Sequence, residues 1–195
     1  NDPANSKDSK IACLRVPRGE VLTRKQIDDY TEFVSNFGAK GLAYIRVKDP
    51  GKGKEGLHSP ILKFLEDDIV KTLLQRVGAQ KGDIIFFGAG PNKIVNDSLA
   101  ALRIELGRNL NLLTSDWAPC WITDFPMYQF NEEDQKIDFH HNPFSMPQVN
   151  IKEFDKSDPL SVLAYQYDLV CNGFEISSGA IRNHLPDLMY KVFSK

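Results

Sequence analysis

The sequence has few cysteines, no long apolar run and no excess of positive charge. Its three cysteines, Cys13, Cys120 and Cys171, lie far apart, and an odd, widely spaced set argues against a disulfide framework and for a reducing compartment. No apolar run approaches the roughly 20 residues of a membrane-spanning helix. The polar start NDPANSKDSK lacks the character of a signal peptide. We therefore expect a cytoplasmic protein without a membrane partner, whose residues 1–10 form a linker or tail.

The charge balance likewise excludes a globally basic protein. The formal net charge is -2 at pH 7 and the pI is about 6.1, so any contact with RNA has to be local. The 195 residues, 42% hydrophobic and 26% charged, are typical of one large or two small folded domains.

Apolar periodicity predicts an α+β fold with a change of pattern near residues 111–116. Before that point, strands are expected at 11–16, 42–48 and 84–87. Helices are expected at 68–77, with Ile69 inward, and at 92–106. An earlier helix begins at Thr23, where Gln26 three residues later predicts a capping box. After this point long strands and hairpins dominate, with a polar turn at 131–136.

Two patterns that could suggest cofactor sites fail on spacing. Residues 88–91, GAGP, follow a strand, but Lys93 stands where a GxGxxG loop needs glycine, so a plain βα turn is expected. Cys120, His140 and His141 lack the CxxC or HxxxH spacing of zinc ligands. Trp117 and Trp121 are expected to pack.

Residues 164–184, AYQYDLVCNGFEISSGAIRNH, predict a β-hairpin. The central Asn172-Gly173 favours a type I′ turn, because both turn residues need φ > 0. A regular ladder from this turn would pair Cys171 with Phe174, Val170 with Glu175, Leu169 with Ile176 and Asp168 with Ser177. One face would then carry Asp168, Val170, Glu175 and Ser177. The other face would form an apolar core of Tyr167, Leu169, Cys171, Phe174 and Ile176.

Arg182 would fall on the opposite face of a regular strand. A β-bulge at Ser177-Ser178-Gly179 would reverse the parity and bring Arg182 onto the face of Glu175. Two acids suit Mg²⁺, which takes its remaining oxygens from water and phosphates, and an arginine fork suits a carboxylate or phosphate. The alternative is an exposed face that carries only a salt bridge.

The same run resembles the bacterial type of aspartyl-tRNA synthetase, a class II synthetase. Its pattern of AYD, NGxE, a small-residue run and [VI]R corresponds here to Tyr167-Asp168, Asn172 to Glu175, Ser177 to Gly179 and Ile181-Arg182. Four further blocks follow the family's order across nearly the whole chain. They occupy residues 14–47, 82–110, 117–130 (WAPCWITDFPMYQF) and 140–148 (HHNPFSMPQ).

The resemblance implies a division of the chain. Residues 11–113 resemble the family's insertion domain, which is named for its occurrence in an amidotransferase subunit and in bacterial aspartyl-tRNA synthetase. Residues 114–195 resemble part of the antiparallel class II catalytic sheet. Motifs 2 and 3, the anticodon-binding barrel and the motif 1 dimer helix have no counterpart. We therefore expect an excised, inactive fragment of a larger, homodimeric ligase.

The resemblance also assigns roles. Arg182 matches the arginine that grips the side-chain carboxylate of L-aspartate, and His141 matches a histidine of the same pocket. Asp168 and Glu175 match the acids that hold Mg²⁺ against ATP. The chain departs from the family at Asn142, where HHPF has its second histidine, and at Ser177-Ser178, where many relatives have glycines.

The parent would activate L-aspartate with ATP and transfer it to tRNA(Asp), and possible charging of tRNA(Asn) stays open. Two alternatives remain. The first is an autonomous tRNA-contacting module, with Lys52 and Lys54 in a basic loop touching the RNA backbone. The second is an unrelated Mg²⁺-dependent phosphotransfer enzyme that uses Asp168 and Glu175.

Overall fold

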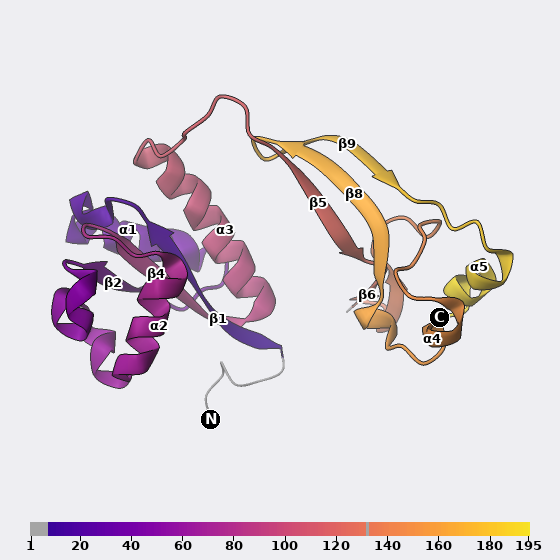
Figure 1. Ribbon diagram of the computed structural model, residues 1–195, viewed down its shortest axis with the longest axis horizontal. Coiled ribbons are helices and arrows are strands. Elements are labelled where there is room, and N and C mark those ends of the chain that lie inside the picture. The colour runs from indigo at the N-terminus through magenta and orange to yellow at the C-terminus, as the bar shows by residue number, and fades with distance from the viewer. Residues whose placement is uncertain (1–7, 132) are drawn as a thin grey trace. The chain divides into compact units, whose positions relative to one another are not determined.

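The computed structural model describes residues 8–131 and 133–195, which form two compact units (Figure 1). Unit 1 is Asn1–Leu113 and unit 2 is Thr114–Lys195. Helices occur in both units, and the strand pairings of the described residues are antiparallel, so the fold is α+β as predicted. Within the described ranges no helix combines the length and apolar character needed to cross a membrane.

Unit 1 is a four-stranded sheet with helices on both faces. The strand order is β1 (Ser9–Val16), β4 (Ile84–Pro91), β2 (Ala43–Val47) and β3 (Leu57–His58). Ile84 and Phe86 of β4 pack with helices α1 (Arg24–Ser35) and α3 (Asn92–Asn109). Ile85, which points to the opposite face, packs with α2 (Asp67–Val77). Short 3₁₀ helices connect these elements: η2 (Gly19–Val21), η3 (Pro50–Gly56) and η4 (Pro60–Phe64).

The beginnings of β1 and α1 test the expectations for the start of the chain. The capping box is confirmed, because Thr23 Oγ1 accepts from Gln26 N and Gln26 Oε1 accepts from Thr23 N. The linker or tail expected at residues 1–10 was predicted to extend too far. Ser9 and Lys10 belong to β1, because they pair with Pro91 and Gly90 of β4. The rest of that tail, residues 1–7, lies outside the described residues.

Two further expectations for unit 1 are corrected. Residues 88–91 belong to β4 and are not a turn, because each of them pairs with a residue of β1. Helix α2 turns Val70 and Leu74 inward, whereas Ile69 is 53% exposed. Leu73 and Val77, which were also expected to face inward, are partly buried against the same core, so the prediction is wrong only for Ile69.

Unit 2 contains a three-stranded sheet and a separate hairpin. The sheet order is β5 (Pro119–Pro126), β8 (Leu163–Cys171) and β9 (Phe174–Ala180), and the hairpin is β6 (Tyr128–Asn131) with β7 (Lys136–Phe139). The core also takes in α4 (Ile151–Phe154) and α5 (Pro186–Phe193), and η5 (Pro159–Ser161) leads into β8. The core side chains are Met127, Tyr128, Phe154, Val162, Ala164, Leu188 and Val192.

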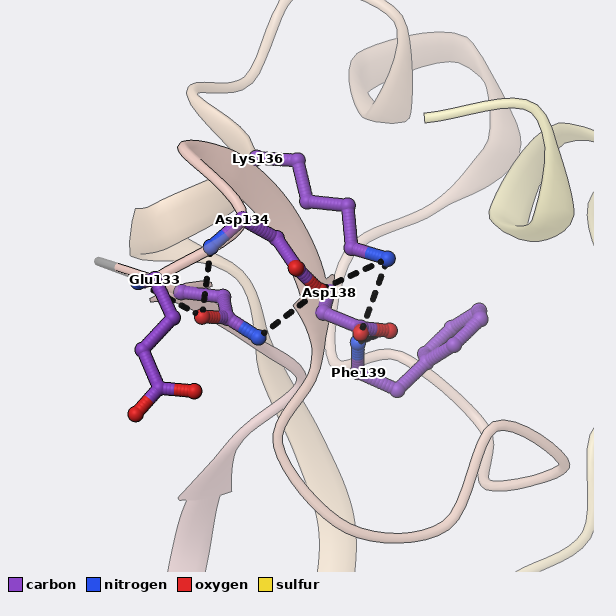
Figure 2. Close-up of polar contacts among 6 residues, drawn as sticks. Glu133, Asp134, Lys136, Asp138 and Phe139 are labelled. Carbon is purple, nitrogen blue, oxygen red and sulfur yellow. Dashed lines mark hydrogen bonds and ion pairs between the residues drawn. The ribbon is translucent and has the colours of Figure 1, made fainter.

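The polar turn predicted at 131–136 is confirmed for its described residues. Asn131 Oδ1 accepts from the backbone N–H groups of Glu133 and Asp134. Lys136 Nζ lies 3.2 Å from Asp134 Oδ2 and 3.8 Å from Asp138 Oδ2, as Figure 2 shows. The side chains thus close the turn that fixes the β6–β7 register.

Candidate functional site

The candidate site begins with the hairpin formed by β8 and β9. Asn172 has φ 53° and Gly173 has φ 86°, so both turn residues take the positive φ that the Asn-Gly pair predicts. Asn172 also ties the turn to the start of β5, because its Oδ1 accepts from Ala118 N at 2.9 Å and its Nδ2 donates to Asp116 O at 2.7 Å. The predicted pairs Cys171–Phe174 and Val170–Glu175 are confirmed.

A β-bulge follows directly, one residue earlier than predicted. Leu169 pairs with Ser177 and Asp168 pairs with Ser178, so Ile176 is the extra residue. The expected pairs of Leu169 with Ile176 and of Asp168 with Ser177 are therefore wrong. In the resulting register Gly179 lies opposite Tyr167, whose ring atom Cε2 would lie 2.6 Å from a Cβ on Gly179, so a side chain at residue 179 would clash.

The bulge has the predicted effect on the faces of the sheet. Asp168, Val170 and Glu175 lie on one face, with Ser178 in place of Ser177. The ladder continues beyond β9 through a hydrogen bond from Ile181 N to Tyr165 O at 2.9 Å. Alternation from this register puts Arg182 on the face of Asp168 and Glu175. The two acids are diagonal neighbours across the strands, a relation that typically separates Cβ atoms by roughly 7–8 Å.

The apolar core predicted on the other face is formed only in part, because Cys171 is buried whereas Tyr167, Phe174 and Ile176 are exposed. Phe174 is 75% exposed, Ile176 is 60% exposed and Trp121 is 61% exposed. Trp121 stacks edge-on against Tyr167, and Trp117 is exposed as well. The expectation that the tryptophans pack is therefore met by Trp121, which contacts Tyr167, although both tryptophans remain exposed.

Arg182 has a distinctive set of neighbours. Residues 145–147 run between β8 and the segment that follows β9. Isolated antiparallel β-bridges join Ser145 to Arg182 and Pro147 to Ala164. The guanidinium Nη1 donates to Asn142 Oδ1 at 3.3 Å. Among the described residues no ion pair involves Arg182, Asp168 or Glu175. The salt-bridge interpretation of the hairpin is therefore not supported by the described residues.

His141 lies directly before Asn142 at the start of the same segment. Its ring packs edge-on against Phe125 at 5.3 Å and against His140 at 4.2 Å. The side chain is exposed, and no hydrogen bond joins it to Arg182 within the described chain. The segment therefore places His141 near Arg182 along the chain without fixing it to the guanidinium.

Asn142 is the site residue that the sequence did not assign. The sequence marks it only as a departure from the family's HHPF pattern, because its contact with Arg182 arises from the packing of residues 142–148 between β8 and the segment that follows β9. Its backbone oxygen accepts from Nε2 of buried Gln166 at 3.0 Å, and the same Nε2 donates to Ser145 Oγ at 2.7 Å.

Asp168 and Glu175 suit a metal that arrives with a substrate. Within residues 8–131 and 133–195 no group of three or more acidic, histidine or cysteine side chains could hold a metal. Two carboxylates on one face fit Mg²⁺ that keeps waters and binds phosphate oxygens, since magnesium seldom uses an all-protein cage.

The lysine loop of unit 1 is partly neutralised. Lys54 Nζ lies 2.8 Å from Asp67 Oδ1, and Lys52 Nζ lies 3.9 Å from Asp49 Oδ2. Any attraction of this loop to an RNA backbone competes with these acids.

Comparison with protein families gives one match. The model of the GAD domain matches residues 1–99. This domain occurs in aspartyl- and asparaginyl-tRNA synthetases and in an amidotransferase subunit. The match lies within unit 1, so Asp168, Glu175, Arg182 and His141 are outside it.

Proposed function

The chain belongs to the GAD domain family, and from that premise we propose that it is part of an aspartate–tRNA ligase. The parent would join L-aspartate to ATP, giving aspartyl-adenylate and pyrophosphate, and then transfer the aspartyl group to tRNA(Asp), releasing AMP. Whether tRNA(Asn) is also charged stays an open part of the proposal. The observation that carries it is the bulged hairpin, whose register puts Asp168 and Glu175 on one face and, continued through the Ile181–Tyr165 hydrogen bond, Arg182 on the same face.

Arg182 is proposed to hold the side-chain carboxylate of aspartate. A guanidinium can donate two parallel hydrogen bonds to a carboxylate. Asparagine would present an uncharged amide, whose NH₂ group would face the N–H donors of the guanidinium without an acceptor between them. The lack of an acidic partner for Arg182 among the described residues supports this role, because the guanidinium charge is not already neutralised.

Asp168 and Glu175 are proposed to hold Mg²⁺, which would neutralise charge on the phosphates of ATP. His141 is proposed to contact the bound aspartate from the segment beside Arg182. The α-carboxylate of the bound aspartate would attack the α-phosphate of ATP, so no protein nucleophile is required. The side chains contribute by positioning the substrates and by stabilising charge.

The remaining assignments belong to the parent. We propose that the parent is a homodimer, because the motifs of the family that have no counterpart in this chain supply most of its dimer interface. The same motifs supply the ATP-binding arginines, so the chain alone would be inactive. We propose a cytoplasmic location because three widely spaced cysteines fit a reducing compartment.

The test is the variant Arg182→Lys in the parent enzyme. Lysine keeps the charge but loses the fork, so aspartate-dependent ATP–pyrophosphate exchange should fall by about 100-fold or more, while the fold survives. The exchange rate and the circular dichroism spectrum measure the two effects. Near-normal activation of aspartate by this variant would contradict the clamp.

A second function is favoured by the position of the family match. The matched residues lie in a unit with its own buried core, as a separate tRNA-contacting module would. Such a module should bind tRNA in a salt-dependent way, more weakly after Lys52→Glu and Lys54→Glu than after the control Lys156→Glu in unit 2. Absence of binding at low salt excludes it.

A further inference from the structure

We propose that Asn142 is a positioning residue, which orients the guanidinium of Arg182 without neutralising it. The inference rests on the proposed function for the identity of the anion, the side-chain carboxylate of aspartate. The geometry that carries it lies entirely within unit 2.

The amide of Asn142 is held by a backbone donor. Its Oδ1 accepts from Phe144 N at 2.8 Å and from Arg182 Nη1 at 3.3 Å. The Phe144 N–H fixes the amide orientation, because only the oxygen can accept from it. The acceptor that faces Arg182 is therefore set by the backbone of the same turn.

The turn that contains Asn142 is held by buried side chains. Gln166 is 7% exposed, and its Nε2 donates both to Asn142 O at 3.0 Å and to Ser145 Oγ at 2.7 Å. Ser145 is completely buried and bridges to Arg182. Asn183 N donates to Phe144 O at 2.8 Å. Both the turn and the Arg182 backbone thus belong to one hydrogen-bonded arrangement.

The chemical type of this acceptor matters for an anion site. An acidic side chain would pair with the guanidinium and repel an incoming carboxylate. An apolar side chain would leave the long, exposed arginine free to sample many rotamers, and ordering it would then count against binding. A neutral amide oxygen fixes one nitrogen and leaves the formal charge and the other donors for the ligand.

The first experiment measures aspartate-dependent ATP–pyrophosphate exchange by the parent enzyme. Asn142→Asp should raise the KM for aspartate about tenfold or more. Asn142→Ala should raise it less, about threefold, because it removes one hydrogen bond and adds no charge. Because Asn142 acts on aspartate binding, kcat should change less than about threefold in both variants.

The matched control is Asn150→Asp. Asn150 caps α4, with its side chain accepting from the N–H groups of Lys152 and Glu153, and aspartate serves equally well at such a position. The control should leave the KM for aspartate unchanged. If Asn142→Asp behaves like the control, or has a smaller effect than Asn142→Ala, the proposal is overturned.

The second experiment separates this proposal from the proposed function. The Arg182 Nε–Hε signal in the ¹⁵N NMR spectrum of the chain, identified by its loss in Arg182→Lys, should move and exchange faster with water in Asn142→Ala, but not in Asn150→Asp. No change in Asn142→Ala refutes the positioning role. A change there, together with a parent that shows no aspartate-dependent exchange, retains the contact and refutes the assigned substrate.

Discussion

His140 and His141 lie side by side but differ in their surroundings. The two rings stack edge-on at 4.2 Å, and His141 is exposed, whereas Nδ1 of His140 is buried without a hydrogen-bond partner among the described groups. Burial, with a smaller contribution from neighbouring His141, lowers the pKa of His140 below its usual value. The fold therefore favours the neutral imidazole at this position.

This lowered pKa predicts a loss of stability in acid. The unfolded state binds the proton more readily, so the contribution of His140 is complete above the unfolded pKa of about 6.5 and is lost as the pH falls through the folded pKa. The urea midpoint, followed by fluorescence of Trp117 and Trp121 in unit 2, should fall between about pH 7.5 and about pH 5.5. The fall should be smaller in His140→Gln. An equal fall in both proteins would refute the assignment.

The elements of unit 1 depend on close backbone contacts at a few glycines. In η3, Gly56 O accepts from the N–H groups of Lys48 and Asp49 at 2.8 and 2.9 Å. A Cβ on Gly56 would lie 1.7 Å from the carbonyl oxygen of Asp49. The return of the chain from η3 to β3 is possible only without a side chain at this residue.

Gly56→Ala should therefore destabilise unit 1 by about 3 kcal/mol, because two backbone segments have to separate. The control is Gly107→Ala in α3, where nothing lies within 4 Å of the added Cβ. Alanine there should stabilise the helix by about 0.5–1 kcal/mol. Urea unfolding followed by circular dichroism measures both, and equal effects of the two variants would contradict the packing described for η3.

Local patterns predicted the turns and caps well, and the register less well. Thr23 with Gln26, and Asn172 with Gly173, specify their conformations through neighbours in the sequence, so both could be predicted. The bulge lies at Ile176, before the predicted Ser177 to Gly179, and local patterns in the sequence do not specify which residue is left unpaired. Helix α5 escaped prediction, although Pro186 at its first turn and buried Leu188 and Val192 four residues apart are typical of a helix.

At the scale of the whole molecule, the candidate site and the family match fall in different units. Residues 1–99 carry the match, whereas the face with Asp168, Glu175 and Arg182 belongs to unit 2. Sequence alone could predict that these three share a face, because the Asn-Gly turn and one bulge determine the parity. It marked Asn142 as a departure from the family pattern but could not predict its contact with Arg182, which joins residues 40 positions apart.

The predicted apolar core of the β5-β8-β9 sheet also depends on more of the molecule than the strands themselves. Alternation along β8 and β9 placed Asp168, Val170 and Glu175 on one face correctly, and the predicted pairing holds from the turn to the bulge but is shifted by one residue beyond it. Burial requires a second layer, and the described residues of unit 2 provide none over Trp121 and Phe174. A sheet face of this kind is consistent with our proposal that the chain is one part of a larger catalytic core.

The most direct test of that proposal is ATP–pyrophosphate exchange with Mg²⁺, measured on the chain and on its parent with L-aspartate and with L-asparagine. We predict exchange by the parent with aspartate only, and none by the chain alone. Exchange by the chain alone would contradict the claim that it holds only part of an active site. A parent that exchanges equally with asparagine, or not at all with aspartate, would contradict the role of Arg182.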